Sequence, residues 1–477
     1  MPAVSPEAEA SAAHARELSQ AVTAARADRK DARTRLNLAL CLLQAGRLQA
    51  ARRQALATRR LAGPDWPELR HLGRLLFKLG LFDAAYDSLV EGLRQDVKDA
   101  AALRVLSALL LKRENLAGAE RALRAAARIE PITPPARFHR GKPTVLRLRS
   151  FDNARYAAAQ DSAGGTYSCR LRGGHFSIKS FVDKSAVNLY LASVMGDNLQ
   201  RVAKIPDFDL AINTVSCADL HARTLRKLDR FLADSDPRRV INPPARVLRT
   251  SRAENARRLG AIGGIVFPRT ELCANEGVPE AVADALLARG FTLPLILRLP
   301  GTQTGETVAK VDDRAGLVTY LKASGQGQPV YVIEYIDCSG EAGYFHKTRC
   351  FFIDRTFYPV ANLSSDVWQI HSGDRYRVMD KVPALQEREK RYLADPRGYL
   401  GETVFAGLHA IRDLLKLDFF GIDFTVDRAG RLIVFEANAA MRHNYDHART
   451  FPYTKAYLDR VSGAFHTMVE TRCARQE

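Results

Sequence analysis

A spacing of 34 residues recurs in the first third of the chain. Four positions within this period are occupied by small or leucine residues in three successive copies, with Glu114 as the one exception. The positions are Ala39, Gly73 and Ser107; Leu42, Leu76 and Leu110; Gly46, Gly80 and Glu114; and Ala51, Ala85 and Ala119. Small side chains let the two helices of a copy approach closely, and the leucines fill the space between copies. The spacing therefore predicts a stack of helix pairs.

This pattern resembles the tetratricopeptide repeat, whose period is about 34 residues. We predict three repeats over residues 30–132, preceded by a partly flexible N-terminal segment, 1–29. The third repeat ends at Pro131, and the proline-rich stretch Pro131–Pro135 opens a linker that we place at 133–144. The alternative is an ordinary bundle of Ala- and Leu-rich helices.

Stacked helix pairs form a groove that suits extended segments, so the repeats predict a peptide or protein partner. Their arginines favour an acidic one. These arginines are Arg52, Arg53, Arg59, Arg60, Arg113, Arg121, Arg124 and Arg128. The alternatives are that the repeats form a homodimer or cap the catalytic core.

The whole chain has 71 Lys+Arg against 53 Asp+Glu, a net charge of +18. Because these basic residues are spread along the sequence, we attribute most of the excess to compositional bias, and a nucleic-acid partner is not expected. The seven cysteines show no metal-binding or disulfide spacing. We see no apolar run long enough for a membrane span and no secretory signal. The sequence therefore predicts a cytoplasmic protein with no membrane partner.

The character of the sequence changes after the linker. Residues 145–148, 176–181 and 208–215 are predicted as strands, and 188–194 as a helix. A second helix is predicted over 252–259. Strands that alternate with helices are typical of an α/β layer. From Phe291 onward the pattern favours hairpins.

The strongest chemical signal lies in residues 418–438. Two apolar runs flank the turn residues Asp427–Gly430, which predicts a pair of antiparallel strands. The two-residue alternation of a strand places Glu436 and Asn438 on one face, and pairing can bring Asp423 opposite them. Two carboxylates and an amide oxygen are hard ligands that suit magnesium. The alternative is a solvated hairpin, but a buried Glu without a cation would be costly.

The spacing of Asp423, Glu436 and Asn438 resembles the metal motif of the ATP-grasp superfamily, as in D-alanine–D-alanine ligase. The resemblance covers roughly residues 200–470. Together with the repeats, it implies a multidomain protein, with all-α tetratricopeptide-like repeats followed by α/β (α+β) pre-ATP-grasp (145–245) and ATP-grasp (246–477) domains. It also implies ATP and Mg²⁺ as cofactors.

The resemblance also implies residues that bind nucleotide. Arg298 ends the strand that delivers a phosphate-binding Lys in the family. The loop 300–305, with Gly301 and Gly305, resembles the flap over the phosphates, although its glycine spacing by itself favours a plain hairpin turn. The family uses the end of the next strand to bind adenine and ribose, and it uses a later basic strand for the triphosphate or an acyl phosphate. These groups correspond here to Glu334, Tyr335, Ile336 and Asp337, and to Lys347 and Arg349.

Two further groups are candidates for the second substrate. Trp368 and His371 follow a strand, whereas His443 and Asn444 follow the metal motif. The family's usual arginine two residues before the metal Asp is replaced by Gly421. We therefore expect Arg349 or Arg442 to stabilise charge on the tetrahedral intermediate.

The resemblance implies a ligase that activates a carboxylate as an acyl phosphate and joins it to an amine. With the repeats, it predicts modification of a recruited peptide or protein, with a small-molecule amine or carboxylate as co-substrate. Two alternatives stay open. One is a kinase that phosphorylates a hydroxyl, and the other is a non-catalytic nucleotide-binding scaffold, favoured by Arg298 in place of Lys.

Overall fold

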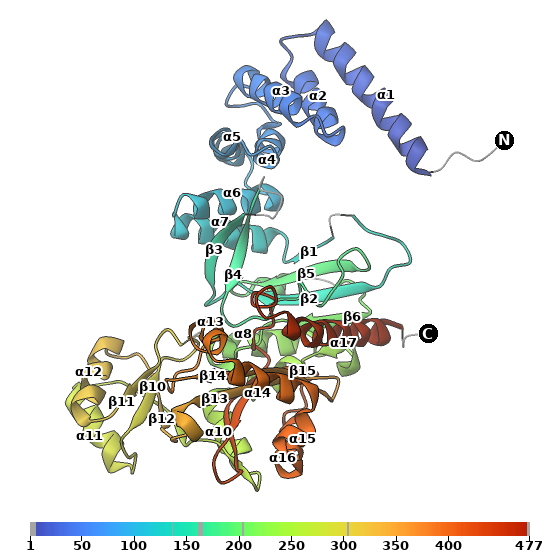
Figure 1. Cartoon of the computed structure of the whole chain (residues 1–477). Coiled ribbons are helices and arrows are strands. Elements are labelled where there is room, and N and C mark those ends of the chain that lie inside the picture. Colours follow the sequence, from blue (N-terminus) through green and yellow to red (C-terminus); the bar gives the residue numbers. More distant parts are fainter. Residues whose placement is uncertain (1–5, 136, 161–165, 203–204, 303–304, 475–477) are drawn as a thin grey trace, which may run out of the picture. The chain divides into compact units, whose positions relative to one another are not determined.

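The chain folds into helices followed by mixed α/β elements, in the order predicted (Figure 1). A computed structural model describes residues 6–135, 137–160, 166–202, 205–302 and 305–474. It divides into two compact units. The first contains Met1–Ile132, Arg155–Arg172 and Val194–Ala203, and the second contains the rest. Among the described helices, none is long and apolar enough to span a membrane.

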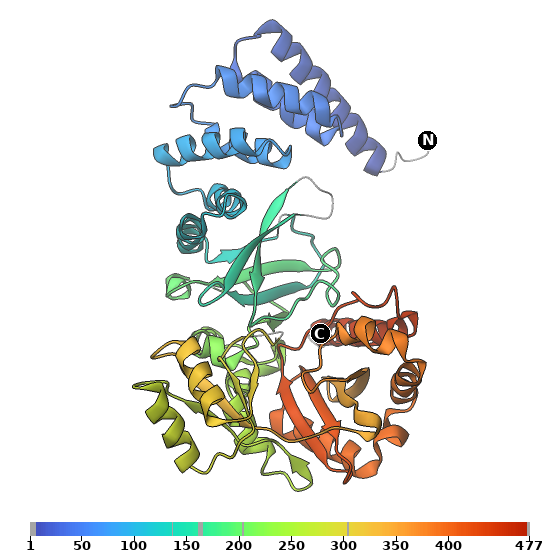
Figure 2. The same cartoon turned by 60° about the vertical axis from the view of Figure 1, so that its left-hand side comes forward.

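The first unit is a series of helices that pack in consecutive pairs, α2 with α3, α4 with α5 and α6 with α7 (Figure 2). Ala51, Ala85 and Ala119 are fully buried where the helices of each pair meet. The elements are α1 Pro6–Ala27, α2 Ala32–Gln44, α3 Leu48–Leu61, α4 Leu69–Lys78, α5 Phe82–Gln95, α6 Ala100–Lys112 and α7 Leu116–Ile129. Most of the segment predicted as partly flexible is therefore helix α1.

The 34-residue period recurs in the backbone. Gly46, Gly80 and Glu114, at the turns inside the three pairs, all have positive φ, of 71°, 75° and 60°. In each turn, the residue that follows donates its N–H to a leucine carbonyl five residues earlier, at 2.8 to 2.9 Å. These repeated turns support the predicted stack of helix pairs, and its assignment as tetratricopeptide repeats stays a prediction.

Ion pairs repeat with the same period. Arg70 pairs with Asp96 at 2.6 Å, and Arg104, 34 residues later, pairs with Glu130 at the position equivalent to Asp96. Each pair ties the first helix of one hairpin to the residue that follows its second helix. The successive copies therefore share tertiary contacts as well as a sequence pattern.

Replacing Glu114 by Gly should raise the free energy of unfolding of the first unit by about 0.5–1 kcal/mol. A left-handed conformation costs a residue with a Cβ about 1–2 kcal/mol, and glycine avoids this cost. Part of the gain is offset because glycine gives the unfolded chain more conformational entropy, which folding must remove. The reverse change, Gly80→Glu, should destabilise the unit. Urea titration followed by Trp66, which packs against this helical core, measures both variants. A loss of stability in Glu114→Gly would contradict the equivalence of the turns.

A β-hairpin completes the first unit. Strands β3 (Arg155–Gln160) and β4 (Tyr167–Arg172) pair in antiparallel fashion, and both contact α6. The Tyr167 ring meets the Phe82 ring edge-on at 5.1 Å. This hairpin falls within the sequence range predicted as an α/β domain, but its contacts place it with the helices.

The second unit begins with a sheet in which β2 (Thr144–Ser150), β6 (Leu210–Asn213) and β7 (Val240–Ile241) run parallel. Two sequence predictions were wrong here. Residues 188–194, predicted as a helix, form strand β5, because a short apolar run has no periodicity that separates the two. Residues 176–181, predicted as a strand, instead form turns that direct Phe176, Ile178 and Phe181 into the core.

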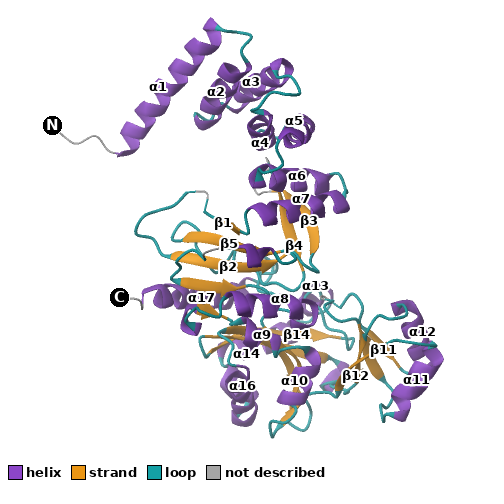
Figure 3. Ribbon diagram, turned by 180° about the vertical axis from the view of Figure 1, so that it is seen from behind, coloured by secondary structure: helices purple, strands orange, loops and turns teal. Residues whose placement is uncertain are grey.

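Two further sheets carry the candidate site, and both are visible as orange strands in Figure 3. The four-stranded antiparallel sheet has the order β11-β10-β12-β9, and the five-stranded sheet has the order β14-β13-β15-β16-β8. The strands of the four-stranded sheet are β9 Thr270–Cys273, β10 Leu295–Arg298, β11 Ala309–Val311 and β12 Val330–Glu334. The strands of the five-stranded sheet are β8 Ile265–Val266, β13 Phe345–Ile353, β14 Thr356–Ser365, β15 Phe419–Val426 and β16 Leu432–Asn438.

A buried aromatic core holds the five-stranded sheet in place. Phe351 and Phe419 stack at 5.3 Å, and Phe419 also meets Phe465 of helix α17 (Lys455–Ala474) at 5.2 Å. The start of β15 is fixed by Asn242, whose Oδ1 accepts hydrogen bonds from the N–H groups of Asp418 and Phe419, at 2.9 and 3.0 Å. The strand that carries the predicted metal ligand is therefore anchored at its first residue.

Candidate active site

The hairpin predicted over 418–438 is present as β15 and β16. Gly430 closes its turn with φ 75°, and Oδ1 of Asp427 accepts hydrogen bonds from two backbone N–H groups within the turn. The register places Asp423 directly opposite Glu436, with an irregularity just after Asp423. Asp423 is 5% exposed. The two carboxylates thus come from adjacent strands, as the alternation of the sequence predicted.

The third strand, β13, supplies the counter-charge to Asp423. Arg349 is the cross-strand neighbour of Asp423 and binds both of its carboxylate oxygens, Nε to Oδ1 and Nη2 to Oδ2, each at 2.7 Å. Burial disfavours the charged form of Asp423, but the adjacent guanidinium outweighs it and holds the pKa below its usual value. Asp423 is therefore an ionised carboxylate in a buried position.

Glu436 is held from a different direction. Arg252, at the start of helix α10 (Arg252–Leu259), places Nη2 3.2 Å from Oε1 of Glu436 and donates Nη1 to the Phe435 carbonyl at 2.8 Å. Asn438 donates Nδ2 to the same Oε1 at 2.6 Å, and its Oδ1 accepts the Ala440 N–H at 2.8 Å. Glu436 and Asn438 are therefore joined in one polar cluster, and Asp423 lies opposite Glu436 on the adjacent strand.

Two further cations stand beside the carboxylates. Nζ of Lys347 lies 4.0 Å from Oδ2 of Asp423 and also donates to the Ile370 carbonyl. Burial lowers the pKa of Lys347, and burial followed by the nearby Arg252 lowers the pKa of Arg298 to about 10. Arg298 therefore remains a cation at neutral pH. Arg298 donates Nη2 to the Thr302 carbonyl, which ties it to the loop predicted as a phosphate flap.

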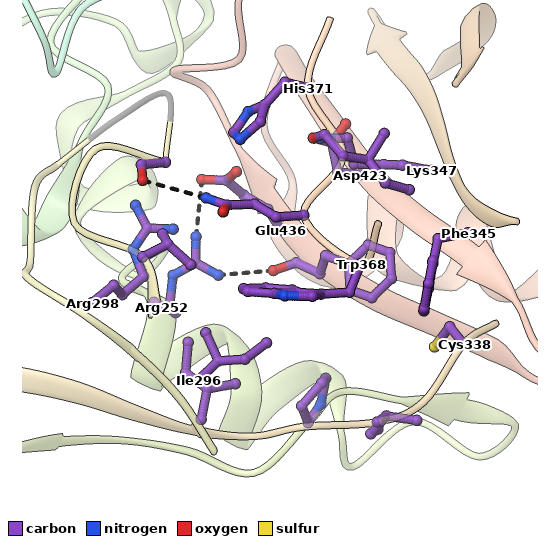
Figure 4. Close-up of a pocket in the computed structure, with 18 of the residues that line it drawn as sticks. Arg252, Ile296, Arg298, Cys338, Phe345, Lys347, Trp368, His371, Asp423 and Glu436 are labelled. Carbon is purple, nitrogen blue, oxygen red and sulfur yellow. Dashed lines mark hydrogen bonds and ion pairs between the residues drawn. The ribbon is translucent and has the colours of Figure 1, made fainter. Parts of the chain in front are cut away.

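These groups line one cavity of about 600 Å³ within the second unit. Figure 4 shows Arg252 and Arg298 side by side in it, with Lys347 next to Asp423. The charged lining side chains are five cations and three carboxylates: Arg252, Arg298, Lys347, Arg349 and Arg442, and Glu334, Asp423 and Glu436. The excess of cations favours a polyanionic ligand.

Apolar and aromatic side chains form a further part of the wall, with Ile296, Ile333 and Phe345 among them. The Trp368 ring meets the Tyr335 ring edge-on at 6.3 Å. The cavity is also lined by the last residue of β12 and by the two residues that follow it, Glu334, Tyr335 and Ile336. An apolar slot next to a cluster of cations can accept a flat base together with its phosphates.

The flap loop meets the segment after β14. Gly305 has φ +76°, and a Cβ at this position would lie 2.6 Å from the His371 ring and 2.8 Å from Nε2 of Gln369. Gln369 also donates to the Gly305 carbonyl at 3.4 Å. Glycine is therefore required here by both conformation and space. Gln303 and Thr304 of the same loop lie outside the described residues.

The structure brings most of the predicted site residues together, but a few lie elsewhere. In the described part of the chain, Gly301 lines a small neighbouring hollow, and Asp337 accepts a hydrogen bond from the Ser339 N–H at 2.9 Å without lining the cavity. His443 stacks on Phe181 at 5.1 Å and bonds to Ser462, and burial lowers its pKa to about 4. Asn444 is half-buried outside the cavity lining.

Sequence reasoning missed Arg252, although it predicted the helix that begins there. The signal for that helix start is Ser251, whose side chain accepts the Glu254 N–H at 3.3 Å, as an N-cap with an acid three residues on. Nothing local indicates that the side chain of the first helical residue reaches Glu436, 184 residues later.

No protein-family model matches the chain, and no curated protein matches its sequence. The solved structures that it resembles include a RimK-domain ATP-grasp protein from Sphaerobacter thermophilus, at 14% identity and a TM-score of 0.38, over 68% of this chain and 99% of that one. A D-alanine–D-alanine ligase from Bacillus anthracis matches at 14% identity and 0.40, over 69% and 98%. The ATP-grasp ligase PsnB, solved with a precursor variant, Mg and ADP, matches at 14% and 0.35, over 69% and 99%. Because these TM-scores lie below 0.5, the assignment of this chain rests on its own residues.

Proposed function

We propose that the second unit is an ATP-grasp ligase, which activates a carboxylate with ATP and joins it to an amine. The observation that carries this proposal is the register of β13, β15 and β16. It sets Arg349, Asp423 and Glu436 side by side across three strands, at the wall of a cavity that also contains Lys347 and the end of β12. Paired carboxylates beside clustered cations are what a metal-bound polyphosphate requires.

The residues present fit magnesium. The donor set is entirely oxygen, from Asp423, Glu436 and the amide of Asn438, and magnesium in nucleotide sites uses one or two carboxylates together with phosphate oxygens. Oε2 of Glu436 accepts no hydrogen bond from the described residues, and each oxygen of Asp423 keeps a second lone pair beside Arg349. Bound there, magnesium would neutralise part of the charge on the phosphates of ATP.

The cations have separate tasks in this proposal. Lys347 and Arg298, both half-buried at the cavity wall, would bind phosphate oxygens of ATP, and the backbone at Glu334–Ile336 would bind the edge of adenine. Arg349 is fixed by Asp423 and cannot swing away, so its remaining N–H groups would meet charge that develops on the substrate. Arg442, at the exposed rim and paired with Asp446 at 2.7 Å, would contact the second substrate.

The reaction balances without a redox partner. An oxygen of the substrate carboxylate attacks the γ-phosphorus of ATP, the bond to the β-phosphate oxygen breaks, and ADP leaves. The amine nitrogen then attacks the acyl carbon, phosphate leaves with the bonding electron pair, and the amine loses a proton. The chain contributes position and fixed positive charge, which lower the barrier to both steps.

The helices of the first unit complete the proposal. Among the described residues, none of those lining the cavity comes from this unit. We therefore assign the helices to recruitment of a peptide or protein substrate, which would raise its effective concentration for the reaction.

Trapping with hydroxylamine tests the proposed chemistry. The full chain is incubated with ATP, magnesium, hydroxylamine and a pool of small molecules and peptides, and the products are identified by mass spectrometry. A ligase should release ADP and convert a carboxylate into its hydroxamate, because hydroxylamine intercepts the acyl phosphate. A phosphorylated hydroxyl would identify a kinase instead, and no ADP above a Glu436→Gln control would identify a non-catalytic scaffold.

A further inference from the structure

The second helices of the repeats end in phase, and so does α1. The last residues of α1, α3, α5 and α7 are Ala27, Leu61, Gln95 and Ile129, each 34 residues after the one before. Helix α1 also packs against α2 and buries Ala25 in the common core. By its position, α1 is therefore the second helix of a partial repeat that precedes the three predicted ones.

An arginine stands next to the last residue of each of these helices. We propose that this arginine ladder, formed by Arg26, Arg60, Arg94 and Arg128, binds an extended acidic segment of a protein partner. That the partner carries the substrate rests on the proposed function, whereas the binding itself does not depend on the chemistry of the cavity.

The ladder arginines differ from most other arginines of this unit. All four are exposed, and none of their side chains forms a hydrogen bond or ion pair with any residue that the structure describes. By contrast, Arg59 pairs with Glu91, Arg113 with Asp83 and Arg124 with Glu120. Arg52 donates Nε to the Leu79 carbonyl at 2.8 Å, so half of the eight arginines that the sequence suggested for partner binding are already engaged within the unit. The ladder arginines have free guanidinium groups, which bind carboxylates through two parallel hydrogen bonds.

The spacing of the ladder suits an extended chain. Helix α3 contacts α5, and packed helices lie about 8–10 Å apart. Residues three apart along an extended segment are separated by about 10 Å. An acidic side chain at every third position of the partner would therefore be spaced to meet Arg60 of α3 and Arg94 of α5 in turn.

Apolar side chains beside the ladder favour a protein over a nucleic acid. Leu61 and Ile129, next to Arg60 and Arg128, are each 42% exposed, and Val97, three residues after Arg94, is 63% exposed. A phosphate backbone offers these side chains no contact, whereas a peptide can place its own apolar side chains between its acidic ones. The alternation of charge and apolar surface points to a segment with the same alternation.

The chain contains a matched control pair. Arg53 and Arg121 lie on the same helices, α3 and α7, as Arg60 and Arg128, and they are also exposed without a described partner. The equivalent position in the middle repeat is occupied by Asp87, so these two arginines are not part of a continuous ladder. The double variants Arg60→Gln/Arg128→Gln and Arg53→Gln/Arg121→Gln therefore remove the same charge from the same two helices.

Fluorescence anisotropy of the full chain with a labelled peptide of repeated Glu-Ser-Leu triplets tests the ladder. We expect salt-sensitive binding, weakened about tenfold in Arg60→Gln/Arg128→Gln and less than about twofold in the control pair, because two charge-assisted contacts are lost only in the former. A peptide with Gln in place of Glu should not bind.

Equal weakening in both double variants would overturn the ladder in favour of unspecific attraction. Tighter binding of a labelled single-stranded oligonucleotide than of the acidic peptide would overturn the assignment to a protein partner. Binding by the Glu436→Gln variant should be normal, so a failure of the proposed ligase chemistry leaves this test intact. Helical circular dichroism of each variant confirms that the first unit is folded.

Discussion

Replacing Glu436 by Gln should lower the rate of ATP turnover by about a thousandfold or more, while the second unit stays folded. The change keeps the shape of the side chain but removes one of the two carboxylates of the proposed magnesium site, and with it the charge that Arg252 binds. Losses of this size are typical when a single group that stabilises transferring charge is removed. ADP release in the presence of hydroxylamine measures the effect.

The matched control is Glu254→Gln. Glu254 also pairs with an arginine, Arg257 at 2.8 Å, and its side chain is 30% exposed against 38% for Glu436. It does not line the cavity among the described residues, so its replacement should leave turnover close to that of the parent. Parent-like turnover in Glu436→Gln would show that the site residues are assigned wrongly.

Replacing Arg349 by Met should lower the free energy of unfolding of the second unit by about 3 kcal/mol and abolish turnover. Removal of one partner leaves the buried Asp423 without its bidentate counter-charge, which typically costs about 3–5 kcal/mol. Lys347, at 4.0 Å from Asp423, compensates only in part, which sets the expectation at the lower end.

The double variant Arg349→Met/Asp423→Leu separates stability from catalysis. Without either charge, the buried position should regain most of the lost stability, but turnover should stay absent, because both groups face the substrate in the proposed reaction. Unfolding is followed in a Trp66→Phe background, where Trp368 is the only tryptophan left. Recovery of turnover in the double variant would show that the pair is purely structural.

The pH dependence of the single variant has a defined sign. In the parent, the lowered pKa of Asp423 contributes stability that is present above the usual carboxyl pKa and is lost as the pH falls below it, through the lowered pKa of the folded state. In Arg349→Met, burial no longer has an opposing cation and should raise the pKa of Asp423. Its protonation then relieves the strain of an unpaired buried charge, so the difference in stability between variant and parent should shrink as the pH falls from 7 toward 4.

The sequence by itself predicted the parts of the molecule that depend on short-range spacing. The 34-residue period places small residues at helix contacts, and the structure shows the same positive φ at Gly46, Gly80 and Glu114. The turn residues Asp427–Gly430 and the alternation of the flanking strands likewise predicted a hairpin that sets Asp423 opposite Glu436. These features depend only on residues close together in the sequence, because the hydrogen bonds of a turn and the alternation of side chains along a strand each involve only a few neighbouring residues.

Only the tertiary structure decided which distant groups meet. The pairing of Asp423 with Arg349 depends on β13 aligning with β15, and the contact of Arg252 with Glu436 depends on how α10 packs. The same holds for residues 188–194, whose short apolar run forms a strand because a neighbouring sheet accepts it. Burial energy does not depend on sequence order, so the local pattern shows which residues are buried but not which surfaces bury them.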